Sequence, residues 1–223
     1  MPKTNPPAVV ADDDFDVDSL MDTVRAKKRE ITIGTTVVLV VAGGLLLWRL
    51  SVTQKSDRAA RALTEATNAL YQGNRPLASS QLQTVVDRYH DTAAGVEGAM
   101  VLAQLDFEEA RSADGIKVLE GIKQSSAIDN FKAPIDGLIG VGYTDQKKYD
   151  DAVKYYQMAS DESKYQSIKD VFQADAARTL TLAGKKDEAR KIWEAIAARP
   201  DSPVLAEAKV RLGELDAVPA TKN

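Results

Sequence analysis

The stretch from residue 56 to residue 216 repeats one pattern of small and large apolar positions. Four segments align without gaps when the sequence is laid over itself at a spacing of 37 residues. Each copy has two small residues twelve positions apart, and two further apolar residues follow four and seven positions after the second. A fixed period of this length is typical of stacked helical units. The four columns are Ala66, Ala103, Gly140 and Ala177; Ala78, Gly115, Ala152 and Ala189; Leu82, Leu119, Tyr156 and Trp193; and Val85, Ile122, Ala159 and Ile196.

Each copy is interpreted as a hairpin of two α-helices. Antiparallel helices approach closely only where the facing side chains are small, and the larger residues fill the space toward the next copy. In the first copy we expect a helix over residues 56–71, an end at residues 73–74, and Pro76 in the first turn of the next helix. After the fourth copy, a helix over residues 204–215 should cover the end of the array. The expected fold is all-α, a solenoid of about four helical hairpins with a C-terminal capping helix.

An uncharged apolar segment, ITIGTTVVLVVAGGLLLW, precedes the repeats at residues 31–48. A helix of this length spans about 27 Å, close to the thickness of the hydrocarbon core of a bilayer. The segment has no polar face, and no small-x-small cleavage site follows Trp48. The sequence therefore predicts a single uncleaved transmembrane helix, with the membrane contacted through residues 31–48.

The charges on either side of this segment indicate its orientation. A basic cluster at residues 25–29 favours a cytoplasmic N-terminus and an exported C-terminal part, although basic residues at 49–61 reduce the contrast. Residues 1–24 contain six aspartates and few apolar residues, which is typical of disorder. We expect a disordered acidic tail at 1–24, a basic flank and transmembrane anchor at 25–50, the solenoid at 56–216 and a disordered tail at 217–223.

Composition excludes several kinds of chemistry. The chain has no cysteine and a single histidine, His90, so thiolate or His-rich metal sites and His-based triads are not expected. A net charge of −4 without a basic stripe argues against a nucleic-acid partner. The adjacent carboxylates at 108–109 and 150–151 do not face one point on a helix, so neither pair forms an acid–base dyad. We therefore expect no enzymatic activity, no cofactor and no metal.

The repeat columns resemble the tetratricopeptide repeat, and the third copy carries the motif most clearly. Copies of 37 rather than 34 residues imply longer loops between hairpins. The resemblance implies a scaffold for protein–protein interaction and little more. The residues that carry it are Gly140, Tyr143, Tyr149, Ala152, Tyr156 and Ala159 in the third copy, and Gly184, Ala189 and Trp193 in the fourth.

The order of the parts also resembles the ancillary SecYEG translocon subunit family of bacteria. That family is similar in its short acidic tail, one N-terminal span ending in Trp-Arg, and exported repeat array, and the segment AGKKDEARKIWEA is similar to one of its segments. The resemblance implies a single-pass protein of the bacterial inner membrane with a periplasmic C-terminal domain. It implies translocon subunits, exported clients or chaperones as partners.

The tetratricopeptide motif further implies a peptide groove lined by the first helix of each hairpin. A mixed apolar and polar groove suits extended or helical peptides. Some apolar members, Leu63, Leu70, Met100 and Phe107, fit a place in the core equally well. The groove positions implied by the motif are Thr67, Tyr71, Gln104, Phe107, Glu108, Val141, Asp145 and Arg178.

The sequence thus favours a membrane-tethered scaffold or chaperone-like adaptor at the protein translocon, on the exported side. Two alternatives stay open. The chain could be a structural accessory subunit of another membrane complex, using its convex face and its span. It could also be a cytosol-facing receptor for targeting peptides.

Overall fold

The structure is a computed structural model that describes residues 28–217, without the side chains of residues 28–35, 37 and 38. The tail predicted at 1–24 lies outside the described residues, as do residues 218–223 of the tail predicted at 217–223. The chain divides into two units, Met1–Val52 and Thr53–Asn223, and each is described by itself. Helix α2 (Lys28–Tyr71) supplies the described part of the first unit and the first helix of the second.

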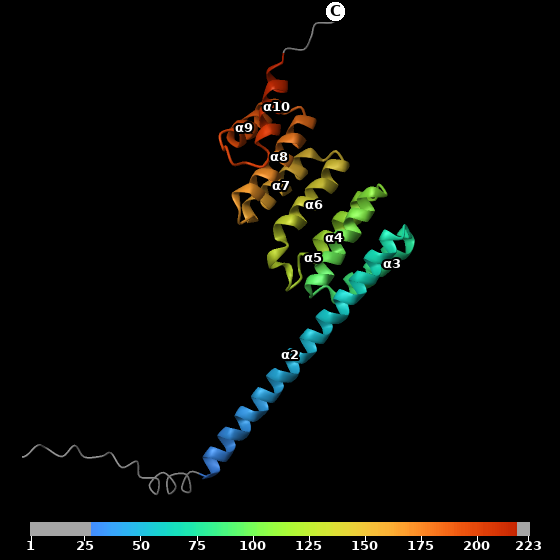
Figure 1. The fold of residues 1–223 in the computed structure, drawn as a ribbon, viewed down its shortest axis with the longest axis vertical. Coiled ribbons are helices and arrows are strands. Elements are labelled where there is room, and N and C mark those ends of the chain that lie inside the picture. The colour runs from blue at the N-terminus through green and yellow to red at the C-terminus, as the bar shows by residue number, and fades with distance from the viewer. Residues whose placement is uncertain (1–27, 218–223) are drawn as a thin grey trace, which may run out of the picture. The chain divides into compact units, whose positions relative to one another are not determined.

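The second unit is an array of helical hairpins (Figure 1). From α3 onward, each helix packs against the next one in sequence. We call α2, α4, α6 and α8 the A helices and α3, α5, α7 and α9 the B helices; α10 covers the last hairpin. The remaining elements are α3 (Arg75–Tyr89), α4 (Ala93–Glu108), α5 (Ser112–Ile122), η1 (Ile128–Asn130), α6 (Lys132–Asp145), α7 (Tyr149–Glu162), α8 (Gln166–Leu182), α9 (Lys186–Ala197) and α10 (Leu205–Asp216).

The predicted period is confirmed by the element bounds. The B helices begin at Arg75, Ser112, Tyr149 and Lys186, each 37 residues after the last. All sixteen residues of the four sequence columns are buried. Small residues in these columns are needed so that the helices can approach each other closely. A Cβ at Gly140 would lie 2.8 Å from the Tyr156 ring. The solenoid of four hairpins and the capping helix are therefore as the sequence predicts.

The turn between the two helices of each hairpin has the same geometry in all four copies. A residue with positive φ stands at one position of the repeat: Gly73 (77°), Ala110 (59°), Lys147 (59°) and Gly184 (78°). In each copy its N–H donates to the carbonyl three residues back, and the following N–H donates to the carbonyl five residues back. This pair of bonds is the Schellman motif, which satisfies the last carbonyl groups of the A helix.

Two of these four turns hold a side chain where glycine fits better. A left-handed conformation costs an L-residue about 1–2 kcal/mol. We expect Ala110→Gly and Lys147→Gly each to raise the free energy of unfolding by about 1 kcal/mol, measured by urea unfolding of the full chain. Gly184→Ala is the matched opposite and should lower it by a similar amount. A loss of stability in both glycine variants would show that these turns are not strained.

The expected longer loops occur at one junction only, so that prediction is wrong for the others. Residues 123–131 between α5 and α6 form a long connection that contains η1. The α3–α4 and α7–α8 connections, residues 90–92 and 163–165, are short. There the extra residues lengthen the helices, since α4 and α8 have 16 and 17 residues.

The predicted membrane span at residues 31–48 lies on α2, and part of it falls on side chains that are not described. Among the residues that the structure does describe, no helix is both long and apolar enough to cross a membrane. The large apolar side chains of α2 in the first unit are exposed, namely Leu39, Val40, Val41, Leu45, Leu46, Leu47, Trp48, Leu50 and Val52.

Candidate functional site

Seven of the eight predicted groove residues occupy two repeated positions on the A helices, and Phe107 lies beside the second. Thr67, Gln104, Val141 and Arg178 stand at one position, 37 residues apart. The other position, one helical turn further on, is held by Tyr71, Glu108 and Asp145. Tyr71 is 88% exposed and Val141 38% exposed, and Gln104, Glu108 and Asp145 are also exposed.

Phe107 and Asp145 come together at the end of their helices. Both line a pocket of about 420 Å³ with residues of the turn at 110–113 and Gln146. The hydroxyl of Ser112 donates to a carboxylate oxygen of Asp145 over 3.4 Å. Phe107 also packs against the core, as do Met100 and Leu63. These three residues therefore contribute to the packing of the core.

Other predicted groove residues are engaged within the array. The Arg178 guanidinium pairs with Asp175 and with Glu207 of the capping helix, and its Nε lies 2.7 Å from Glu207 Oε1. The hydrogen bond from Arg178 lowers the pKa of Glu207, and the same bond raises the pKa of Arg178. Glu108 pairs with Arg75 over 2.7 Å, and the Thr67 hydroxyl donates to the Leu63 carbonyl over 3.0 Å. Arg178 thus holds the capping helix in place.

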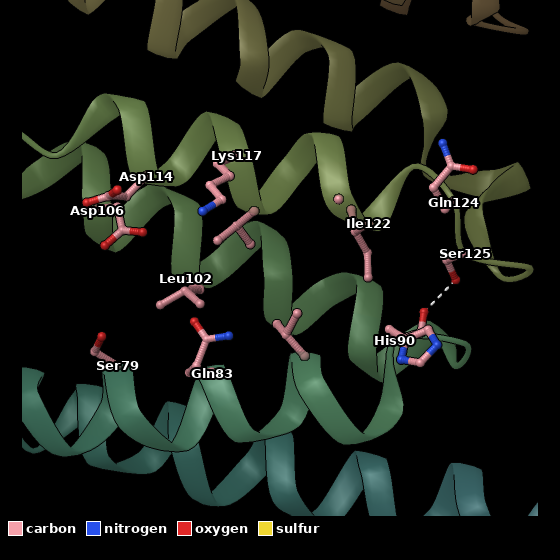
Figure 2. A pocket seen from close by; sticks show the side chains of 13 residues that line it. Ser79, Gln83, His90, Leu102, Asp106, Asp114, Lys117, Ile122, Gln124 and Ser125 are labelled. Atoms are coloured by element: carbon pink, nitrogen blue, oxygen red, sulfur yellow. Dashed lines mark hydrogen bonds between the residues drawn. The ribbon is translucent and has the colours of Figure 1, made fainter.

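A groove that the sequence analysis did not predict lies between the B helices α3 and α5, and we call it groove 1. Its volume is about 520 Å³. Figure 2 shows Gln83 and Lys117 extending into it from opposite walls, with Leu102 of α4 between them on the floor. At one end the Ser125 hydroxyl donates to the carbonyl of His90 (Figure 2).

A second groove of the same construction lies between α7 and α9, with α8 as its floor, and we call it groove 2. Its volume is about 400 Å³. Six of its eight lining residues are the equivalents of groove 1 residues, displaced by 74 residues, or two copies. The equivalent pairs are Gln83 and Gln157, Val86 and Ser160, Leu102 and Ala176, Lys117 and Lys191, Val118 and Ile192, and Gly121 and Ala195.

The equivalent space between α5 and α7 is filled by Tyr155. This residue stands where groove 1 has Val118 and groove 2 has Ile192. Its ring stacks on Tyr143 at 5.4 Å between centroids, and its hydroxyl donates to Glu120 Oε1 over 3.2 Å. Burial, together with the negative charge of Glu120, raises the pKa of Tyr155 to about 12. The hydroxyl therefore stays protonated and acts as a donor.

Lys123 also helps to fill this middle space between α5 and α7. Its ammonium lies 5.5 Å from the centroid of the Tyr155 ring and 2.6 Å from Asp136, whose side chain is fully buried. The equivalent positions in grooves 1 and 2 are the shorter Val86 and Ser160. Because these longer side chains occur in the middle space alone, it is the one space of the three that the chain itself closes.

Comparison with known proteins places this fold among repeat proteins. A family model described as a tetratricopeptide repeat-like domain matches residues 26–215. The crystal structure of MamA is similar with a TM-score of 0.55 and 15% identity, covering 67% of this chain and 81% of that chain. A Podosopora anserina protein of nearly identical TPR-like repeats, named after the kinesin light chain, gives a TM-score of 0.57 at 16% identity and covers 72% and 86% respectively. At such identities the likeness shows the fold alone.

One curated relative matches a shorter stretch. The metal cation symporter ZIP8 of Mus musculus is 35% identical over 95 residues, which are 42% of this chain and 20% of the symporter. The chain therefore spans about a fifth of the length of that relative. Between residues 28 and 217, no three His, Cys, Asp or Glu side chains are grouped so that they could hold a metal ion.

Proposed function

Because the chain belongs to the tetratricopeptide repeat-like family, we propose that it is a non-enzymatic scaffold or chaperone-like adaptor that holds other proteins. Repeats of this fold generally mediate protein–protein interaction. The observation that carries the proposal is the pair of open grooves of equivalent construction on the B helices, since stacked repeats present the same surface more than once.

The proposed scaffold is tethered to a membrane through residues 31–48. The segment carries no charge, and the large apolar side chains described on α2 between Leu39 and Val52 are exposed. Soluble monomers rarely expose continuous apolar surface of this extent, so lipid is the expected surrounding. The basic residues at 25–29 support a cytoplasmic N-terminus and an extracytoplasmic array.

The proposed place of action is the protein translocon of the bacterial inner membrane, on its exported side. The support is the order of parts in the sequence: an acidic tail, an apolar segment ending in Trp48-Arg49, and a repeat array. In this proposal the partners are translocon subunits together with exported clients or chaperones, and no cofactor takes part.

Cell fractionation and protease treatment test this proposal. We expect the chain to stay in the membrane pellet after an alkaline carbonate wash. We also expect protease added to the exported side of intact membranes to digest residues 53–217. Replacing residues 31–48 with a Gly/Ser-rich segment of equal length should release the chain from the pellet, while circular dichroism confirms that the helices remain.

Two results would contradict the proposal in different ways. Release of the unaltered chain by carbonate would disprove the tether. Digestion only after the cells are lysed would favour the cytosol-facing receptor. Purification from mild detergent with one partner in fixed ratio, and no exported proteins, would favour the structural subunit of another membrane complex.

A further inference from the structure

The chain itself fills one of the three equivalent spaces between neighbouring B helices, and the residue that fills it suggests an occupant for the two open grooves. In the middle space Tyr155 lies between α5 and α7, with its hydroxyl bonded to Glu120. The equivalents of Glu120 in grooves 1 and 2 are Gln83 and Gln157, both of which line their groove. A glutamine amide oxygen can accept the same hydroxyl hydrogen bond.

The shape of the open grooves fits the same ring. Where the middle space has Tyr155 and Met158, groove 1 has Val118 and Gly121, and groove 2 has Ile192 and Ala195. The smaller side chains leave volumes of about 520 Å³ and 400 Å³ over a floor formed by Leu102 or Ala176. An aromatic ring buries a large area with little loss of conformational entropy, which suits a groove of this kind.

A lysine at the same repeated wall position of each groove can pair with a carboxylate beside that ring. Lys117 and Lys191 occupy equivalent positions in the two grooves. None of the ion pairs between residues 28 and 217 involves either lysine. The acidic residues of groove 1, Asp106 and Asp114, face Arg111, which pairs with Asp106 and lies 4.0 Å from Asp114. In groove 2, Asp161 comes from α7, the wall opposite Lys191.

We propose that grooves 1 and 2 each bind a tyrosine side chain of a partner protein that has a carboxylate residue next to it. The ring takes the place that Tyr155 holds in the middle space, and its hydroxyl donates to Gln83 or Gln157. The neighbouring carboxylate pairs with Lys117 or Lys191. This inference rests on the proposed scaffold function and specifies what the B-helix surface recognises.

Methyl NMR of the full chain in detergent tests the inference. The probe is the capped peptide acetyl-Glu-Tyr-Glu-amide, and the reporters are the methyl groups of Val86 in groove 1 and Ala195 in groove 2. We expect saturable shifts at both reporters. Acetyl-Glu-Leu-Glu-amide should give no saturable shift. Acetyl-Lys-Tyr-Lys-amide should bind roughly threefold more weakly, because an exposed ion pair is replaced by repulsion.

Two variants place in an open groove the tyrosine that fills the middle space. Val118→Tyr should abolish the shift at Val86 and leave that at Ala195, and Ile192→Tyr should do the reverse. The chain holds tyrosine at this position in the third copy, and thermal unfolding checks that each variant folds. No saturable shift at either reporter, an equal response to the leucine peptide, or shifts that persist in the matching variant would overturn the inference. Such a result would not refute the proposed scaffold function, because partners could bind other surfaces of the array.

Discussion

Gly95→Ala should lower the free energy of unfolding by about 3 kcal/mol or prevent folding. Gly95 lies in the first turn of α4, where the chain turns back from α3. A Cβ at this position would lie 1.9 Å from the carbonyl oxygen of Tyr89. That oxygen cannot move aside easily, because it accepts hydrogen bonds from the Thr92 N–H over 2.9 Å and the Thr92 hydroxyl over 2.8 Å.

The matched control for this prediction is Gly213→Ala. Gly213 lies inside α10, and a Cβ there would meet nothing within 4 Å. Alanine is the better helix former, so this variant should gain about 0.5–1 kcal/mol. Urea unfolding followed by circular dichroism measures both. A Gly95→Ala variant as stable as the unaltered chain would show that the α3–α4 corner is packed differently.

Arg199→Ala should lower the free energy of unfolding by about 3 kcal/mol at neutral pH. Asp170 is 1% exposed, and Arg199 contacts both of its oxygens, at 2.8 Å and 3.1 Å. Removing the guanidinium leaves a buried carboxylate without its counter-ion, although the hydrogen bond from Gln166, over 2.7 Å, remains. The contact joins α8 to the segment after α9, so the loss should act on the last hairpin.

Arg190→Ala is the matched control for Arg199→Ala. Arg190 lies 2.6 Å from Asp216, whose side chain is 67% exposed, so its loss should cost less than about 1 kcal/mol. Urea unfolding of both variants at the same ionic strength gives the comparison. Equal small losses would show that the buried pair contributes no more than an exposed one.

The effect of Arg199→Ala should shrink in acid. Burial acts to raise the pKa of Asp170, but hydrogen bonds, first that from Arg199, outweigh it and hold the pKa below its usual value. Stability from a lowered pKa is fully present above the unfolded value, about 3.9, and is lost as pH falls through the folded value. The difference between the two proteins should therefore be largest near neutrality and decline below about pH 4. A difference that grows in acid would contradict this assignment.

The periodic part of the fold could be predicted from sequence because it depends on residue size at fixed spacing. Alanine or glycine at 66, 103, 140 and 177 permits close helix contact wherever it occurs, and the structure buries all four. The turns were harder, since Ala110 and Lys147 are not residues that favour positive φ. Only their alignment with Gly73 and Gly184, at the same position of the repeat, indicates a positive φ.

The site could be predicted less well because it depends on contacts between copies. Arg178 has the residue type of an exposed groove position, yet it pairs with Glu207, 29 residues away on the capping helix. Grooves 1 and 2 depend on the absence of a large side chain, which an alignment of small columns does not show. One comparison within the sequence indicates the grooves: at the repeat position of Tyr155, the copies before and after it have the smaller Val118 and Ile192.

In-cell photo-crosslinking tests the central claim, that this array holds several other proteins, most directly. Probes at Gln104 on the A helices and Gln83 in groove 1 sample the two faces, since both side chains are exposed. We predict products with translocon subunits and with several different exported proteins, identified by mass spectrometry. No product with another protein from either position, or the same single partner from both, would contradict the account.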